Sequence, residues 1–438
     1  MKIHLKKRNI QICSLIVLMF MLVILMNHSH TEEDDLVDNM RFADVKVTPV
    51  ETNEYLNVVD YDYVDNFQSL LKNSREIVHN TAHGKCKERR SFVFIKTMKC
   101  GTQTLVNMFR RFVYLRHLNF MLPRLDKIYL GWPYTINEHD FRPSKKQFDG
   151  LLEHSVYNRT VMKKFIRKDA AYITIIREPF SHFKSSFNYF NVGNISLVQE
   201  SDHISGYLQN LDKYETFYKS PEGARLRYCI PDGFSVTKNL LSNCLGMPLG
   251  FPPGRENIEA DDTLIREYIK QLDADFDLVM IMEYFHESLI LLKRIMCWSF
   301  EDLLYQTSNV GTYKSKNAST SVKNLNIYKK WSQADYILYN YFNATFWKKI
   351  SNEGKDFHEE VTEFSDVQAK VTSFCQTNGT KEALVINAAR FTDEFVVHKD
   401  FCIMQQVDLS VYLKTRYERI EGWKEDEEYT KKYPLKTC

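Results

Sequence analysis

Three short apolar segments are each followed by a stretch with helical periodicity, and this alternation constrains the fold more than any other feature. The pairs are 91–96 with 102–114, 171–177 with 180–190, and 276–282 with 286–297. A strand followed by a crossover helix, repeated along the chain, is typical of parallel sheets covered by helices. We therefore predict an α/β fold, with a parallel sheet flanked by helices. Such sheets bind ligands where strands end and helices begin, so the strand-to-helix junctions are the places to look for chemistry.

Residues 12–26 form an apolar run that predicts a membrane anchor. Basic side chains within residues 2–8 precede the run and acidic residues 32–35 follow it, which favours a type II orientation with a cytoplasmic amino terminus. A cleaved signal peptide is the alternative, because the run is short and lies near the amino terminus. We expect a cytoplasmic tail over 1–11, a signal-anchor transmembrane helix over 12–26, a lumenal stem over 27–85 and a folded domain over 86–438.

Two residue types agree with an oxidising lumen for everything after the anchor. Candidate N-glycosylation sequons occur at Asn27, Asn158, Asn194, Asn317, Asn343 and Asn378. All but one of the nine cysteines follow the anchor, and an oxidising compartment allows them to pair. The local bridge that we expect joins Cys229 to Cys244.

Net charge and cysteine spacing argue against two kinds of function for this chain of 438 residues, nucleic-acid binding and metal binding. Lys and Arg number 58 against 56 Asp and Glu, so the net charge of +2 gives no molecule-wide field that would attract nucleic acid. The sequence has no CxxC pair and no metal-ligand spacing, so we expect no metal site. Because the net charge is close to zero, any anion-binding site must depend on positive charge that is concentrated in one part of the chain.

The first junction, residues 91–105, has the features of a phosphate-binding loop. An apolar segment runs into a short turn with one glycine, and a helix follows. Successive backbone N–H groups and the positive end of the helix converge at such a turn. Ten basic residues and one acidic residue between Lys85 and Arg124 add local positive charge. The GxxxxGK[ST] motif of nucleotide-triphosphate loops is absent, and a solvated basic face beside an ordinary helix end is the alternative interpretation.

The second junction places an arginine where a buried strand ends. Arg177 closes the segment 171–177, Pro179 suits the first turn of a helix, and Ser185 follows eight residues after the arginine. A guanidinium at this place can bind a second phosphate through paired hydrogen bonds. A structural arginine paired with a nearby carboxylate is the alternative.

Four sequence blocks together resemble those of the galactose-3-O-sulfotransferases, a family of membrane-anchored Golgi enzymes. The blocks are F-I-K-T-M-K-C-G-T-Q-T-L at 94–105, I-I-R-E-P-F-S-H-F-K-S-S-F-N-Y-F at 175–190, F-D-L-V-M-I-M-E-Y-F-H-E-S-L-I-L-L-K-R at 276–294 and L-Y-N-Y-F-N-A-T-F-W at 338–347. The resemblance extends roughly from Cys86 to Gly422. It implies a sulfotransferase catalytic domain over 86–438 with the P-loop-like parallel sheet, flanked by helices, of the PAPS sulfotransferase fold. The co-substrate would be 3′-phosphoadenosine 5′-phosphosulfate (PAPS), without a metal.

The resemblance also implies roles for individual residues. Those that match the family's 5′-phosphosulfate loop are Lys96, Lys99, Gly101, Thr102 and Thr104. Arg177 and Ser185 match its 3′-phosphate site. His154 lies where the family has a histidine between these motifs, and it is our candidate for the base that activates the acceptor hydroxyl. Lys99 would stabilise negative charge in the transition state, and Glu283 is the next candidate for the base.

One residue departs from the family pattern. The family loop reads K-T-H-K, and this chain has Met98 in place of the histidine. A thioether cannot exchange a proton, so Met98 cannot act as an acid or a base.

The function that the resemblance implies is transfer of a sulfuryl group from PAPS to a galactose hydroxyl, at the 3-position, of a glycolipid or glycoprotein glycan. We expect a single-pass type II protein of the Golgi membrane, with no nucleic-acid partner, and leave open a homodimer. The alternatives are a sulfotransferase for another carbohydrate and, because of Met98, an inactive glycan-binding relative.

Overall fold

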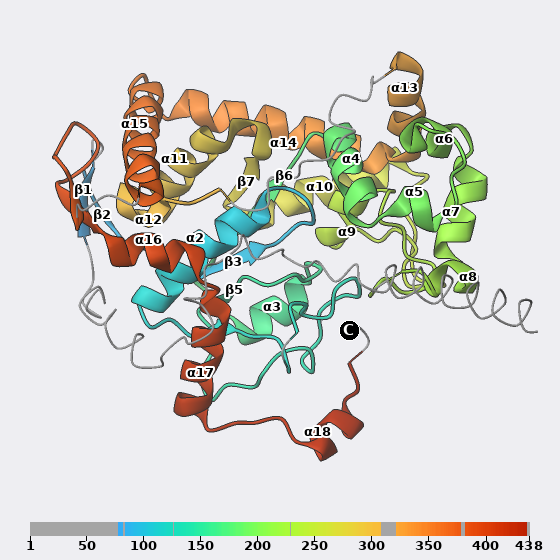
Figure 1. Cartoon of the computed structure of the whole chain (residues 1–438), viewed down its shortest axis with the longest axis horizontal. Coiled ribbons are helices and arrows are strands. Elements are labelled where there is room, and N and C mark those ends of the chain that lie inside the picture. Colours follow the sequence, from blue (N-terminus) through green and yellow to red (C-terminus); the bar gives the residue numbers. More distant parts are fainter. Residues whose placement is uncertain are drawn as a thin grey trace, which may run out of the picture.

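The computed structural model of the chain (Figure 1) describes residues 78–81, 84–125, 127–227, 229–307, 321–377 and 382–435. The expected anchor over 12–26 and the sequons at Asn27, Asn317 and Asn378 lie outside these ranges. No helix within the described ranges is long and apolar enough to cross a membrane.

A five-stranded parallel sheet lies at the centre of the fold. Its spatial order is β4 (Phe120–Met121), β5 (Gly150–Leu151), β3 (Phe92–Ile95), β6 (Ala171–Ile176) and β7 (Leu278–Ile281). The first strand of this sheet along the chain, β3, is thus its middle strand in space. The prediction of a parallel α/β sheet is confirmed.

Each of the three predicted strand-to-helix pairs is present. The helices are α2 (Thr102–Leu115) after β3, α4 (Pro179–Tyr189) after β6 and α11 (Phe285–Met296) after β7. Glycine in the left-handed conformation begins α2, and Pro179 occupies the first turn of α4 as expected. A short 3₁₀ turn, η4 (Met282–Tyr284), separates β7 from α11.

Smaller elements surround this frame. Two antiparallel pairs join β1 (Val78–Thr81) to β2 (Gly84–Lys87) and β8 (Ala383–Ile386) to β9 (Phe395–His398). The other helices are α3 (Arg159–Phe165), α5 (Val192–Ile195), α6 (His203–Gln209), α7 (Leu211–Lys219), α8 (Pro221–Ala224), α9 (Leu240–Cys244), α10 (Asp262–Asp275), α12 (Phe300–Leu303), α13 (Val322–Trp331), α14 (Gln333–Asn352), α15 (Phe357–Gln376), α16 (Lys399–Gln406), α17 (Leu409–Glu421) and α18 (Glu427–Lys432). Ordered structure includes β1, which precedes the expected domain boundary at Cys86.

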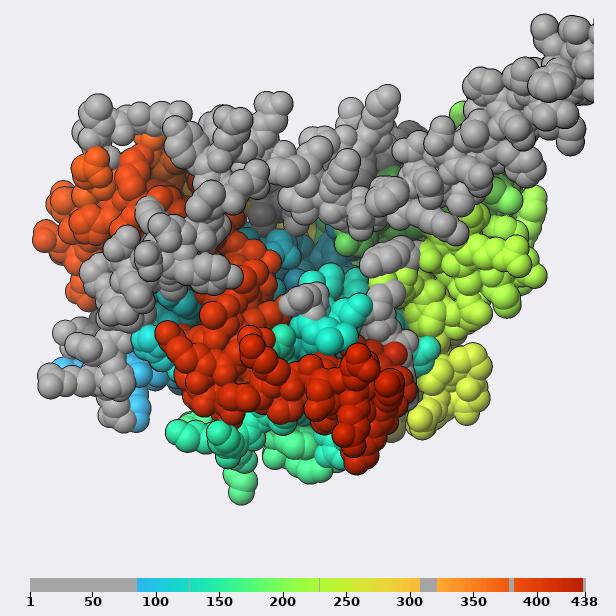
Figure 2. Space-filling view, turned by 60° about the horizontal axis from the view of Figure 1, so that its bottom comes forward, coloured from blue at the N-terminus to red at the C-terminus, as the bar shows by residue number. Residues whose placement is uncertain are grey.

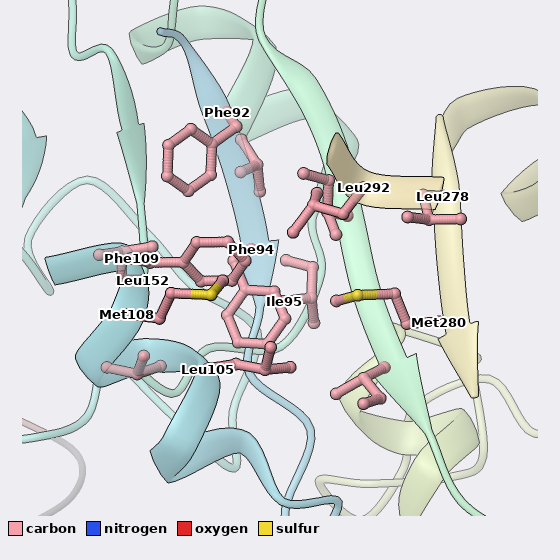
Figure 3. Close-up of a cluster of buried hydrophobic side chains, with 14 of the residues drawn as sticks. Phe92, Phe94, Ile95, Leu105, Met108, Phe109, Leu152, Leu278, Met280 and Leu292 are labelled. Atoms are coloured by element: carbon pink, nitrogen blue, oxygen red, sulfur yellow. The ribbon is translucent and has the colours of Figure 1, made fainter. Parts of the chain in front are cut away.

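The strands are apolar without alternation because helices cover both faces of the sheet. Every residue of β3, β6 and β7 is buried. Figure 3 shows Phe94 of β3 beside Phe109 of α2, and it also labels Leu292 of α11, which belongs to the same buried cluster. This packing gives the loops at the strand ends a rigid base.

Two disulfides join cysteines that both lie in the described ranges, and the expected local bridge is not one of them. Cys86 in β2 pairs with Cys297 after α11, and Cys375 pairs with Cys402. The predicted Cys229–Cys244 bridge is wrong: Cys244 is a buried free thiol, while Cys229 is bonded elsewhere. Cys244 packs inside an apolar cluster, which removes it from any surface partner.

The carboxyl-terminal segment crosses the face formed by residues near 120–150. Figure 2 shows this segment in red against the teal part of the chain. Arg124, 1% exposed, donates to Glu425 and to the backbone oxygens of His139 and Tyr433. A second ion pair joins Arg142 to Glu418 at 2.7 Å. We call α17, α18 and the chain between them the carboxyl-terminal strap.

Candidate active site

Four neighbouring strands bring the predicted site residues to one edge of the sheet. The loop 96–101 follows β3, Arg177 follows β6, His154 lies after β5 and Glu283 lies after β7. The chain leaves β3 toward β4 on one side and leaves β6 toward β7 on the other. This reversal between β3 and β6 is the switch point at which open α/β sheets bind their ligands.

The loop after β3 leads into an uncapped helix. Gly101, with φ 68°, stands at the N-cap of α2 and has no side chain with which to cap the first N–H groups of that helix. A Cβ at Gly101 would lie 2.6 Å from the Met282 sulfur, so a larger residue would strain both backbone and packing. Thr102 and Thr104 are buried in the first turn. The amino end of α2 is therefore available to an anion.

Four side chains donate hydrogen bonds to four consecutive carbonyl oxygens of this loop, those of residues 96–99. The donors are His154 Nδ1 to Lys96 O at 2.9 Å, Thr102 Oγ1 to Thr97 O at 3.2 Å, His182 Nε2 to Met98 O at 2.8 Å and Arg177 Nη1 to Lys99 O at 3.3 Å. We call these four donors the carbonyl clamp. Because a carbonyl and the following N–H point in opposite directions from one planar peptide, the clamp determines where the N–H groups of the loop point.

Both loop lysines have lowered pKa values. Burial lowers the pKa of Lys96 to about 8, and the charge of Glu153 partly opposes this shift. Burial also lowers the pKa of Lys99 to about 8, with a further contribution from the positive charge of Arg177. Neither lysine forms an ion pair with a carboxylate in the described part of the chain, so an anionic ligand would be their natural counter-ion.

An exposed tyrosine contacts Lys99. The Lys99 Nζ lies 3.7 Å from the centre of the Tyr189 ring, which is at the end of α4. The ring quadrupole attracts the ammonium and holds it at the site. Ser185, one turn earlier on α4, is half-buried.

His154 is buried and neutral. Its Nδ1 faces a carbonyl oxygen and must therefore carry the proton, which leaves the lone pair on Nε2. Burial, with the nearby charge of Lys96, lowers its pKa well below the ordinary value. The tautomer is the one that a general base at Nε2 requires, and the same residue belongs to the carbonyl clamp.

The Met98 side chain is buried in the protein interior. Its side chain is 3% exposed and packs in an apolar cluster with Trp132, Phe180 and Phe183. The departure from the family pattern at this position therefore affects a buried contact in this chain.

Much of the basic stretch identified in the sequence serves the fold. Arg116 pairs with Glu88 and Asp302, and Arg110 pairs with Glu153 and Asp408. Arg124 belongs to the contact with the carboxyl-terminal strap, and Arg111 donates to the backbone oxygens of residues 301 and 302. Among the basic residues of this stretch, Lys96 and Lys99 are the ones at the loop.

Sequence reasoning missed His182 and Tyr189. Both lie inside the block 175–190, but the pattern gives no signal that one contacts a loop carbonyl and the other an ammonium. Glu283 is exposed, and its two oxygens accept from the Glu178 N–H and the Tyr339 hydroxyl. Within the described residues, no group of three or more His, Cys, Asp or Glu side chains is arranged to hold a metal ion.

The sequon asparagines of the described ranges differ in accessibility. Asn194 is exposed on α5. Asn158 caps α3 through its side-chain oxygen while its amide donates to Ile136 O at 3.3 Å. Asn343 is half-buried in α14, and its side-chain oxygen is fully enclosed.

Comparison with known proteins gives consistent matches. A family model described as galactose-3-O-sulfotransferase matches residues 4–399. Galactosylceramide sulfotransferase of Mus musculus is 30% identical over 306 residues, covering 68% of this chain and 67% of that protein. The Homo sapiens protein of the same name is 29% identical over 321 residues, covering 72% and 70%. Galactose-3-O-sulfotransferase 3 of Bos taurus is 28% identical over 292 residues, covering 64% and 63%. No solved structure matches. This chain belongs to the galactose-3-O-sulfotransferase family.

Proposed function

We propose that this protein transfers the sulfuryl group of PAPS to the 3-hydroxyl of galactose on a glycolipid or glycoprotein glycan. Family membership supports the reaction class, and the names of the relatives support galactose as the acceptor sugar. The observation that carries the proposal is the uncapped amino end of α2, beside Lys99 and Arg177 at the switch point of the sheet.

The residues at this edge fit a nucleotide with phosphates at both ends. Lys96, Lys99 and Gly101, with the hydroxyls of Thr102 and Thr104, would hold the 5′-phosphosulfate. Arg177 and Ser185 would hold the 3′-phosphate. The fit rests on two lysines without carboxylate partners and on a glycine at which a Cβ would meet Met282.

PAPS supplies a sulfuryl group whose bond to the bridging phosphate oxygen breaks as the bond to the acceptor oxygen forms. The ammonium of Lys99 is assigned to the negative charge that develops on the departing phosphate oxygen. Nε2 of His154 is assigned to the proton that the acceptor hydroxyl loses. The Nδ1 contact of His154 with the loop keeps that lone pair in place.

A Golgi location with a lumenal catalytic domain is part of the proposal. Disulfides Cys86–Cys297 and Cys375–Cys402 support it, because such bonds form in oxidising compartments. The apolar run at 12–26 supports a type II anchor.

The test uses the full-length protein in detergent with sulfur-labelled PAPS. The acceptor panel contains galactosylceramide, galactose-terminated glycans and glycans ending in other sugars. We expect label on galactose-terminated acceptors, with linkage analysis placing it on the 3-hydroxyl. If label appeared only on another sugar, that sugar and not galactose would be the acceptor. Glycan binding without any transfer would instead identify an inactive relative.

A further inference from the structure

His182 is a buried histidine of α4 that touches the proposed phosphosulfate loop. It is 1% exposed, and its Nε2 lies 2.8 Å from the carbonyl oxygen of Met98. Since a carbonyl oxygen can only accept, Nε2 must carry the proton. Burial lowers the pKa of His182 to about 4, so the ring remains a neutral donor across the pH range of the secretory pathway.

The peptide between Met98 and Lys99 is held at two points. The Met98 side chain packs into the apolar cluster, and the Met98 carbonyl accepts a hydrogen bond from His182 at 2.8 Å and a weaker one from the Cys100 thiol at 3.3 Å. The N–H on the other side of the same planar peptide belongs to Lys99, so it points away from His182. Lys99 itself has φ 59°, a left-handed conformation that costs roughly 1 kcal/mol for a residue with a side chain.

Contacts from outside the loop must stabilise this left-handed backbone conformation of Lys99. A peptide flip would relieve the strain at Lys99 and would exchange its N–H for the Met98 carbonyl on the anion-binding side. A carbonyl oxygen there would repel a phosphate or a sulfonate. Without His182 the buried Met98 carbonyl would keep only the weak thiol donor of Cys100, which opposes this exchange less than the histidine does.

We propose that His182 is a positioning residue for the anion site, which it orients by binding the Met98 carbonyl and so aiming the N–H of Lys99. The role rests on the proposed function, since it concerns the loop that would bind the 5′-phosphosulfate. Arg177 and His154 hold adjacent parts of the loop and are assigned further roles of their own. His182 is assigned to the backbone alone.

The experiment compares three substitutions by calorimetry with 3′-phosphoadenosine 5′-phosphate. In His182→Gln, the amide nitrogen occupies nearly the place of Nε2 and keeps the donor. In His182→Asn, a shorter amide falls short of the Met98 oxygen, and in His182→Leu the donor is absent. We expect affinity within ~3-fold of wild type for Gln and a loss of ~10-fold or more for Asn and Leu.

Two further measurements separate positioning from a general effect on folding. His286→Leu removes a histidine that instead contacts Ser365 and Tyr305, and it should leave nucleotide affinity unchanged. In steady-state kinetics, the Asn variant should raise KM for PAPS with little change in KM for the acceptor.

The outcomes are distinct. Normal affinity in a folded Asn or Leu variant would overturn the positioning role while leaving the proposed function intact, as would an equal loss in Gln and Asn. If Leu does not fold, the comparison of Gln with Asn decides the question. A wild-type protein that binds no nucleotide would overturn both proposals.

Discussion

At the scale of single residues, the candidate site combines charges that differ in their surroundings. Arg177 is a guanidinium that donates to the loop backbone, whereas Lys99 is a half-buried ammonium against an aromatic ring. A guanidinium binds a phosphate through two parallel hydrogen bonds, and an ammonium acts as a point charge. The two residues should therefore contribute differently to binding and to turnover.

Arg177→Ala should weaken binding of 3′-phosphoadenosine 5′-phosphate by about 2 kcal/mol or more, because it removes a charged donor to phosphate. Lys99→Ala should weaken this binding less and reduce turnover more, since Lys99 is assigned to charge that develops in the transition state. Calorimetry and steady-state kinetics measure the two effects. Arg167→Ala, which breaks an exposed pair with Asp169, is the control. Unchanged affinity in Arg177→Ala would exclude it from the 3′-phosphate site.

Nucleotide affinity should fall as the pH rises through about 8. The pKa of each loop lysine is lowered to about 8 in the free protein, so the ammonium forms predominate below that pH and are lost above it. The phosphates of the ligand are already ionised, since their second pKa is about 6. Lys99→Arg keeps one charge at high pH and should make the fall shallower. Constant affinity from neutral pH to about one unit above the lysine pKa would contradict the lowered values.

His154 has two assigned roles, donation from Nδ1 to the loop and proton acceptance at Nε2. Different substitutions can separate these roles. His154→Asn keeps an amide donor near the position of Nδ1 and removes the lone pair of Nε2. It should lower kcat by ~10²-fold with nucleotide affinity near normal, as expected for loss of a general base. His154→Ala should also weaken nucleotide binding, because Lys96 O loses its donor. Full turnover in the Asn variant would move the base elsewhere, with Glu283 the next residue to test.

At the scale of elements, the sequence pattern correctly predicted those helices, strands and turns whose formation depends on residues that are close in sequence. The apolar runs, Gly101 and Pro179 identified three strands, three helices and the loop between β3 and α2, because each depends on neighbouring residues. The carbonyl clamp could not be predicted, since His154 and His182 reach the loop from distant parts of the chain. The Cys229–Cys244 prediction failed for a related reason: nearness in sequence says nothing about burial in a cluster.

The surroundings of the sequons within their helices also predict which asparagines carry a glycan. We expect a glycan on Asn194 and none on Asn343, because Asn194 is exposed while the side-chain oxygen of Asn343 is enclosed by packing. If the chain enters the secretory pathway as proposed, Asn194→Gln should reduce its mass by one glycan, and Asn343→Gln should not. Mass spectrometry of glycosidase-treated and untreated protein checks both. A glycan on Asn343 would require α14 to lie differently.

At the scale of the whole molecule, the carboxyl-terminal strap connects the end of the chain to the sheet's β4–β5 side. Arg124→Met would leave Glu425 buried without its partner, and breaking a buried pair in this way costs about 3–5 kcal/mol. The variant should have a lower Tm and faster proteolysis within the strap, with unchanged nucleotide affinity. Glu418→Gln, at a more exposed pair, is the control and should cost under ~1 kcal/mol. Equal Tm values for wild type and Arg124→Met would show that the strap contributes little.

The Cys86–Cys297 bond spans 211 residues and encloses the whole central sheet in a covalent ring. In the proposed lumenal location, Cys86 would be synthesised and exposed to oxidants long before Cys297, and Cys100 and Cys244 would follow it in between. Both of these thiols end buried and unpaired, so any bond that they make with Cys86 during synthesis must later be exchanged. Production of this protein should therefore depend on disulfide isomerase capacity, and a host that only oxidises thiols would accumulate mispaired chains.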